Sequence, residues 1–246
     1  MSAANTGENV VPVLRPLTAR SVVLSLLLGA HPPSLAVRDL VRAAGRLDIS
    51  DTTLRVALTR MVAAGDLYRA AGTYSLTERL LARQRRQDAS VHPAMRVWRG
   101  AWEMVVITAS GRSSTARATL RSQLALLRLA ELREGIWMRP ANLKRAWPGH
   151  LDTLSRRFTG RPEGDPAGLA AELWDLRGWA ASGRALLDVF ADAALPSDRF
   201  TIAAAMVRHL LTDPMLPAEL LPPEWPAEQL RAAYAAYQLE VRSLGG

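Results

Sequence analysis

The sequence predicts a mainly helical α+β fold in three parts, and three observations support this. Two helical patterns with capping residues, followed by a short hairpin pattern, occupy residues 34–76. A strand–helix–strand pattern occupies residues 102–139, and helical patterns dominate after residue 168. A chain of 246 residues suits two or three small domains. We therefore expect a flexible N-terminal arm at 1–17 and domains at 18–88, 94–160 and 168–246.

The first helix is expected directly after Thr18. The preceding residues are polar and contain Pro12 and Pro16, which is typical of a loose arm. Val22–Leu28 is apolar nearly all round, so we expect it to be buried inside the N-terminal domain. The stretch has seven residues, whereas a membrane span needs about 20. The first eleven residues are polar and do not resemble a signal peptide, so we expect a cytoplasmic protein with no membrane partner.

Residues 37–65 predict two helices joined by a turn. Val37–Ala44 is typical of a short helix that Gly45 ends. After a turn at 45–49, Ser50 can cap a second helix, and Asp51 lies near the positive N-terminal end of that helix. Gly65 ends the second helix. This is the order of a helix-turn-helix motif.

The second helix has an inner and an outer face. Its inner face carries apolar residues at helical spacing: Leu54, Ala57, Leu58 and Met61. The outer face carries threonine and arginine side chains, the types that a recognition helix uses. Arginine can bond guanine in a bidentate manner, and threonine offers base edges a hydroxyl and a methyl group. The alternative is a solvated face of an ordinary helical subdomain.

Leu67–Leu76 predicts two short strands around a turn at Gly72. A hairpin directly after a recognition helix is a wing, and Arg69 could reach phosphate or the minor groove from it. We therefore predict an N-terminal winged helix-turn-helix. The arginines that follow either contact phosphates or form a solvated helix face; they are Arg79, Arg83, Arg85 and Arg86. The candidate DNA-binding residues are Ser50, Thr52, Thr53, Arg55, Val56, Thr59, Arg60 and Arg69.

The net charge of +8 and the pI of about 11.0 favour a polyanionic partner such as nucleic acid. Lys144 is the only lysine, which a high-GC genome would explain, but the excess of positive charge needs another reason. The chain has no cysteine, so disulfides, thiolate nucleophiles and zinc-finger or iron–sulfur sites are excluded. The lack of cysteine also fits a reducing compartment.

The central part predicts a ferredoxin-like α+β unit. Trp102–Thr108 is rich in β-forming residues and is expected to be a buried strand. Ser113 or Ser114 can cap the next helix, and Ile136–Arg139 predicts a second strand that Pro140 stops. After a loop at 160–168, helices are expected at about 169–193, 198–212 and 226–243.

The sequence bears on catalysis and on the binding of a small ligand. No P-loop, Gly-x-Ser-x-Gly or His-Glu-x-x-His motif is present, and the four histidines lack metal-ligand spacing, so we expect neither an enzyme nor a cofactor or metal. All seven tryptophans lie outside the predicted DNA-binding domain. They either line a ligand pocket or pack a core. The effector-binding candidates are Trp98, Trp102, Trp137 and Arg139.

Several segments resemble the PaaX family, bacterial repressors named for phenylacetic-acid degradation genes. The first is residues 51–77, which contain the second helix and the hairpin. The second is the Trp-Arg-Gly-Ala-Trp run at 98–102, and the third is Gly-Ile-Trp-Met-Arg-Pro at 135–140. The most specific is Asp-Pro-Met-Leu-Pro-Ala-Glu-Leu-Leu-Pro at 213–222, followed by Trp225-Pro226. Ala227 departs from the pattern, because the family has glycine after this Trp-Pro.

The resemblance covers about residues 18–240. It implies an N-terminal winged helix, a central domain similar to a small CRISPR-adaptation nuclease, and a helical C-terminal domain. It also implies a homodimer that binds double-stranded DNA at a near-palindromic operator. A small effector would release the DNA, and for the namesake repressors this effector is phenylacetyl-CoA. One-component regulators change ligands more readily than folds, so another acyl-CoA or aromatic acid is equally open.

The leading hypothesis is therefore a dimeric, ligand-responsive transcriptional repressor. The runner-up is an acyl-CoA or aromatic-ligand binding protein whose winged helix mediates protein contacts. A metal-dependent nuclease is a distant third, because such an enzyme needs carboxylates to hold its ion. The first central strand ends in Ile-Thr-Ala-Ser-Gly at 107–111, with no carboxylate.

Overall fold

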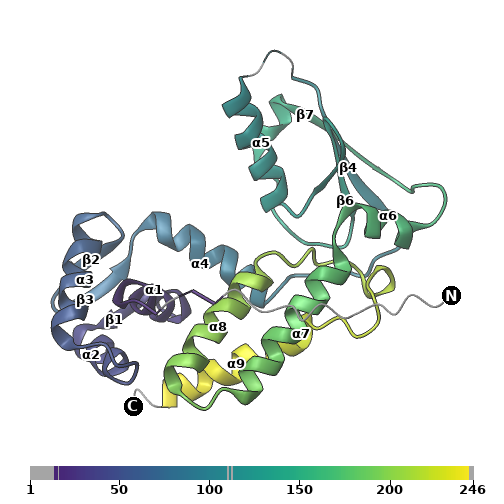
Figure 1. Cartoon of the computed structure of the whole chain (residues 1–246). Helices are drawn as coiled ribbons and strands as arrows, with labels where there is room; N and C mark the ends of the chain where they lie inside the picture. Colours follow the sequence, from purple (N-terminus) through teal and green to yellow (C-terminus); the bar gives the residue numbers. More distant parts are fainter. Residues whose placement is uncertain (1–13, 16, 110, 112, 244–246) are drawn as a thin grey trace. The chain divides into compact units, whose positions relative to one another are not determined.

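The computed structural model describes residues 14–15, 17–109, 111 and 113–243 (Figure 1). The predicted arm at 1–17 lies almost entirely outside the described residues. The protein is a mainly helical α+β protein, as predicted. It forms two compact units, and each is described by itself. Unit 1 comprises residues 1–92, 180–213 and 226–246, and unit 2 comprises residues 93–179 and 214–225.

The N-terminal part of unit 1 contains four helices and a three-stranded antiparallel sheet with strand order β1-β3-β2. In chain order these elements are α1 (Ala19–Gly29), β1 (Ser34–Ala36), α2 (Val37–Gly45), α3 (Asp51–Ala63), β2 (Leu67–Ala70), β3 (Thr73–Leu76) and α4 (Glu78–Val91). The helix, turn, helix and hairpin lie where the sequence predicts them. The strand β1 was not predicted, because three residues are too short to show a period of two.

Side-chain caps fix the starts of α1 and α3. Thr18 and Ser21 form a reciprocal capping box at the start of α1. At α3 the Ser50 hydroxyl accepts from the Thr53 amide at 3.2 Å, which satisfies one of the free N–H groups of the first turn. Gly65 follows α3 with a φ of 68°, a backbone conformation that favours glycine, so the chain can turn directly into β2.

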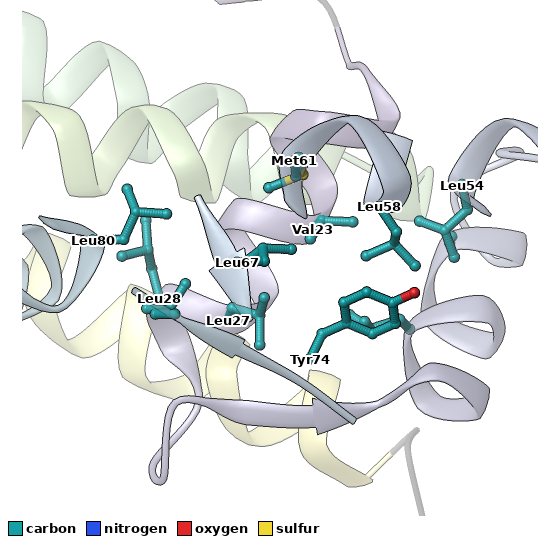
Figure 2. Packing of buried hydrophobic residues seen from close by; sticks show 12 residues of the cluster. Val23, Leu27, Leu28, Leu54, Leu58, Met61, Leu67, Tyr74 and Leu80 are labelled. Carbon is teal, nitrogen blue, oxygen red and sulfur yellow. The ribbon is translucent and has the colours of Figure 1, made fainter. Parts of the chain in front are cut away.

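The N-terminal elements share one apolar core (Figure 2). Leu54, Leu58 and Met61 of α3 are buried, as the helical spacing predicts. They pack with Leu27 of α1 and with Tyr74 of β3. Burying a leucine side chain stabilises a fold by roughly 1.5–3 kcal/mol. This core therefore fixes which face of α3 points inward and which is left for a partner.

A buried carboxylate connects three of these elements. Asp66, in the turn between α3 and β2, is 1% exposed. It accepts hydrogen bonds from Arg20 of α1 and from Arg79 of α4. The Thr77 hydroxyl also donates to the Asp66 carbonyl oxygen at 3.1 Å. The end of α3 is thus joined by polar contacts to the starts of α1 and α4.

The C-terminal helical segments belong to the same unit, and two of them, α8 and α9, contact α4. They are α8 (Pro196–Leu210), α9 (Ala227–Ser243) and the part of α7 (Leu176–Asp192) that follows residue 179. Gln87 of α4 donates to the Tyr234 hydroxyl of α9 at 3.4 Å. Arg231 of α9 donates to the Ser90 carbonyl oxygen at 3.2 Å and pairs with the buried Asp213. The described residues up to His92 therefore share a unit with segments that begin at residues 180 and 226.

Unit 2 is built around a four-stranded antiparallel sheet with strand order β5-β6-β4-β7. Its elements are β4 (Trp102–Ile107), α5 (Ser114–Leu126), β5 (Ala130–Arg133), β6 (Ile136–Pro140), η1 (Gly149–Thr153), β7 (Ser155–Gly160), α6 (Pro166–Leu173), the start of α7, and η2 (Ala218–Leu220). This is the split strand–helix–strand order of ferredoxin-like domains, with the short 3-10 helix η1 in place of a second α-helix. The Ser113 hydroxyl caps α5 by accepting from the Ala116 amide at 3.2 Å.

Two buried clusters stabilise this sheet. Trp102 and Met138 pack with Leu216 and Leu220 from the Pro-rich segment that follows residue 213. Val105 and Trp137 instead pack with Leu124 of α5 and Leu151 of η1. In Figure 1, α5 lies against the sheet of this unit. Trp225 packs against the first of these clusters and stacks on Trp179, with ring centroids 4.3 Å apart.

The structure differs from the sequence expectations at several boundaries. Helix α4 continues to Val91, although residues 88–93 were expected to be a linker. The helix expected at 169–193 is two helices, α6 and α7, because Trp174 has an extended backbone. Pro140 is the last residue of β6 rather than the residue beyond it. Among the described helices, none combines the length and apolar character that crossing a membrane requires.

Candidate nucleic-acid interface

The outer face of α3 is the surface on which the sequence placed DNA recognition. Thr52, Thr53, Val56 and Arg60 line a surface hollow of about 540 Å³ together with Arg20 of α1. Val56 is 45% exposed, although it is a large apolar residue at the centre of this face. The opposite face of the helix is buried, so the two-sided character expected of α3 is present.

Three of the predicted contact residues are used by the helix itself. Ser50 and Thr53 share a hydrogen bond of 2.8 Å between their hydroxyl groups, and both belong to the N-terminal cap. The Thr59 hydroxyl donates to the Arg55 carbonyl oxygen at 2.9 Å. By contrast, the side chains of Thr52 and Arg60 form no hydrogen bond or ion pair within the described part of the chain. These two are therefore the polar groups of α3 that are free to meet a ligand.

Arg55 is held by a neighbour on its own helix. Its Nε atom lies 2.8 Å from Oδ1 of Asp51, one turn earlier, and both side chains are more than half exposed. Exposed pairs at this spacing contribute only about 0.3–0.5 kcal/mol. Arg55 can therefore leave Asp51 for a stronger partner at small cost, but Asp51 puts a negative charge beside the predicted base-contacting positions.

The predicted hairpin ends in a tight turn at which Ala71 and Gly72 have positive φ values of 46° and 76°. Positive φ at both central residues is typical of the turns that match the twist of a two-residue hairpin. The turn presents Arg69, whose guanidinium carbon lies 5.8 Å from the ring centroid of Tyr74. Tyr68 beside it is 64% exposed.

The four arginines of α4 have different surroundings. Arg79 binds Asp66 and Arg85 binds Glu78, so both have protein partners. Arg86 is exposed. Arg83 faces a cavity elsewhere in unit 1. Protein partners thus bind Arg79 and Arg85, and phosphate contacts stay a prediction for Arg83 and Arg86.

The four effector candidates do not come together as one site. Trp98 and Trp102 belong to one apolar cluster and Trp137 to another. Trp98 is half-buried and donates to the Ala101 carbonyl oxygen at 2.7 Å. Arg139 is fully buried. Its guanidinium donates to the carbonyl oxygens of Pro140 and Met215 and to Asn142, at 2.9–3.1 Å. Arg139 thus acts as a structural cross-link in unit 2, and its geometry gives no support to a phosphate-binding role.

The comparisons with known proteins bear on all three parts of the chain. Residues 18–80 match the family described as "PaaX-like protein", residues 95–157 match the "PaaX protein central Cas2-like domain", and residues 177–245 match the "PaaX-like protein C-terminal domain". The chain belongs to the PaaX-like family. A solved structure, the uncharacterized protein Rv0674 from Mycobacterium tuberculosis, shares 51% identity over 94% of this chain and 98% of that one, with a TM-score of 0.82. No curated protein matches the chain.

In this PaaX-like protein the N-terminal family match, 18–80, includes the whole candidate interface from α1 to β3. The central match extends from residue 95 into β7, and the C-terminal match contains α7, α8 and α9. The family is regulatory, and the protein is accordingly a regulator-like member of it. Its described residues contain no group of three or more acidic or histidine side chains placed to hold a metal ion.

Sequence reasoning missed Arg20 of this PaaX-like protein as part of the interface. Arg20 lies on α1, where the sequence shows only a buried apolar helix, and it reaches the α3 face through the fold. Its pairing with Asp66 leaves the side chain 53% exposed. The sequence signal that could have found it is the position of Arg20 in the capped first turn, two residues before the apolar run that begins at Val22.

Proposed function

We propose that this protein is a dimeric, ligand-responsive transcriptional repressor whose N-terminal part is a winged helix-turn-helix that binds a near-palindromic operator. The observation that carries the proposal is the outer face of α3. Thr52, Val56 and Arg60 are exposed on one side of the helix and bind no other described side chain. The other side of the helix is buried in the apolar core. A helix held in this way presents a fixed set of side chains to the major groove.

The groups on α3 suit base recognition. Arg60 carries a free guanidinium that can bond guanine O6 and N7, and Val56 offers an apolar contact to a thymine methyl group. Thr52 lies in the first turn of α3, the end of a recognition helix that contacts bases in helix-turn-helix proteins. Ser50, Thr53 and Thr59 shape and rigidify this surface through their own hydrogen bonds.

The surrounding arginines suit the phosphate backbone. Arg20 borders the α3 hollow, and Arg69 lies on the hairpin that we propose as the wing. The net charge of +8 supports the same partner. Phosphate contacts supply affinity that falls with salt, whereas base contacts supply the sequence preference.

Dimerisation and release by an effector complete the proposed function. A two-fold dimer would match two half-sites about one helical turn apart and double the base contacts. A small effector, phenylacetyl-CoA or another acyl-CoA or aromatic acid, would release DNA if it bound better to a state with misplaced recognition helices. Family membership supports both ideas. The molar mass of the purified protein, measured by light scattering at several concentrations, tests the dimer.

The deciding experiment is fluorescence anisotropy with DNA from upstream of the protein's own gene and a scrambled duplex. We expect Arg60→Ala to weaken specific binding by about 1–3 kcal/mol and to relax the preference between the two duplexes. Arg60→Lys keeps the charge but loses the bidentate geometry, so it should lose preference more than affinity. Arg184→Ala removes an exposed arginine of α7 and serves as the matched control.

The outcomes separate the hypotheses. Specific binding that is unaffected by Arg60→Ala would remove α3 from base recognition. Absence of specific binding at every salt concentration would favour the runner-up, a ligand-binding protein whose N-terminal elements contact another protein.

A further inference from the structure

A cavity of about 490 Å³ lies inside unit 1, away from the outer face of α3. It is bounded by the end of α1, the start of β1, and helices α2, α4, α8 and α9. Its volume is within the range of small-molecule sites, about 300–1,000 Å³. Every lining residue belongs to unit 1.

Most of the lining is apolar. The larger apolar side chains are Leu26, Leu28, Phe200, Val207, Leu211 and Tyr237. Small residues, among them Gly29, Ala203 and Ala204, leave the space between them open. A Cβ atom on Gly29 would lie 3.5 Å from Gln238 Nε2 and 3.8 Å from the Tyr234 hydroxyl, so side chains of α9 pack closely on the backbone of α1 there. Such a lining suits an aryl or alkyl body.

Two arginines without partners face this apolar space. Neither Arg83 of α4 nor Arg208 of α8 forms a hydrogen bond or ion pair with any other described residue. The Nη2 atom of Arg208 is buried and has no hydrogen-bond partner. A buried donor that lacks a partner costs about 1–3 kcal/mol, so a ligand that supplies an acceptor would remove this cost.

The electrostatic surroundings of both arginines favour an anion. Burial, followed by the nearby charges of Arg15 and Arg83, lowers the pKa of Arg208. Arg83 lies at the exposed edge of the cavity, and its partial burial, followed by the charges of neighbouring arginines, Arg86 first, lowers its pKa. Among the described residues of the lining, one is acidic, Asp39 of α2, and it already lies 3.8 Å from Arg38 and 3.9 Å from Arg42. The cavity therefore holds uncompensated positive charge.

We propose that this cavity binds a small organic acid, with its carboxylate between Arg83 and Arg208 and its aryl or alkyl body among the apolar side chains of α1, α8 and α9. A carboxylate has two oxygens, and two guanidinium groups can each donate to it. A CoA thioester lacks that carboxylate and carries its charge on several phosphates, for which two cations are too few. The geometry therefore favours a free acid over its thioester.

The site is placed to influence α3, and this part of the inference rests on the proposed function. The cavity is lined by the last turn of α1, whose Leu27 shares the core with Leu54 and Leu58 of α3. Gln84 of α4 donates to the Leu28 and Ala30 carbonyl oxygens at 3.1 and 2.9 Å, which fixes the same turn. A ligand that shifts α1 against α4 would shift the support of α3, and so couple the two sites.

Isothermal titration calorimetry of the full chain with phenylacetate, octanoate, phenylacetamide and phenylacetyl-CoA tests the site. Tryptophan fluorescence is unsuitable, because all seven tryptophans lie in unit 2. We expect at least one of the two carboxylates to bind, and the neutral amide to bind about tenfold more weakly or worse than phenylacetate. Arg208→Gln and Arg83→Gln should each weaken carboxylate binding by a similar factor, whereas Arg184→Gln should leave it unchanged.

Several results would overturn the proposal. They are the absence of binding by either acid at millimolar concentration, equal affinity for phenylacetate and its amide, and tight binding of the thioester that both arginine variants retain.

Ala204→Leu, which fills the cavity without changing charge, should abolish binding of the carboxylate. Circular dichroism would show that each variant is folded. If an acid binds but the anisotropy of the DNA complex does not change, the site stands and its coupling to DNA is rejected.

Discussion

Arg20 in the first turn of α1 donates to the carboxylate of Asp66, which is buried in the turn directly after α3. The contact matters for the proposed interface because Arg20 also borders the hollow on the outer face of α3. One side chain therefore both fixes the end of α3 and contributes positive charge beside it.

Asp66→Asn tests how much this arrangement stabilises unit 1. The amide keeps the shape but loses the charge that both Arg20 and Arg79 bind, so we expect the free energy of unfolding to fall by about 1–3 kcal/mol. Urea denaturation followed by circular dichroism measures it. Asp88→Asn breaks the exposed pair with His31 instead and should cost less than about 1 kcal/mol. Equal effects of the two changes would contradict the structural role of Asp66.

The backbone at Ala71 predicts a stabilising substitution. A side chain other than glycine or asparagine at positive φ costs roughly 1 kcal/mol, and Ala71 has a φ of 46° at the exposed hairpin turn. Ala71→Asn should therefore raise the free energy of unfolding by about 0.5–1 kcal/mol, because Asn-Gly is the favoured pair for this turn. Thermal unfolding measures the change. A loss of stability would mean that the hairpin turn is different from the one described.

Asp51→Asn is expected to tighten DNA binding. It removes a negative charge from the proposed interface and releases Arg55 from its ion pair. If Arg55 then contacts one additional phosphate, the slope of log affinity against log salt concentration becomes steeper by about 0.9. Anisotropy titrations at several salt concentrations give both quantities. Weaker binding would show instead that Asp51 is needed to position Arg55 or to stabilise the start of α3.

Arg139→Lys separates the structural role of this residue from the effector role that the sequence suggested. Lysine has one charged nitrogen and cannot reach the separated acceptors on Pro140, Asn142 and Met215. We expect unit 2 to lose about 2–4 kcal/mol of stability. Tryptophan fluorescence during urea unfolding reports on this unit selectively. Arg133→Lys, at an exposed position of β5, should have little effect.

Tyr237 gives unit 1 a dependence on alkaline pH. Burial raises the pKa of its phenol well above the ordinary value of about 10. The stability that this phenol contributes is therefore complete below about pH 10 and is lost as the pH rises further, because the unfolded chain releases the proton first. Between pH 9 and 11, roughly the range that brackets the ordinary value, the stability of the wild type should fall relative to Tyr237→Phe. Parallel curves would contradict the burial of this phenol.

The sequence predicted the local features of the fold well, because the signals are short-range. The Ser50 cap, the inward face of α3 and the turn at Gly72 each depend on residues a few positions apart. The edge strands were missed for a physical reason. Most of β7 is exposed and polar, and β5 is short, so neither shows the apolar alternation of a half-buried strand.

The proposed sites were predictable only in part, because their geometry depends on contacts between distant residues. The outer face of α3 follows from helical periodicity, but Arg20 joins it only through the packing of α1 on α3. Arg139 was predicted to bind a ligand, but it donates to the Met215 carbonyl oxygen, 76 residues away in the sequence. No local pattern shows that contact. Arg83 and Arg208 lie on helices 125 positions apart, and no local pattern relates them to one cavity.

The packing of α4 against α8 and α9 determines when unit 1 can finish folding during synthesis. The ribosome completes α4 at residue 91 and begins α8 at residue 196. At about 5–20 residues per second, the buried face of α4 waits roughly 5–20 s for its partners. A nascent chain therefore exposes this face while α3 is already complete. The N-terminal elements reach their full packing only after α9 has left the ribosome, so the proposed DNA binding depends on chains in which these C-terminal helices have been made.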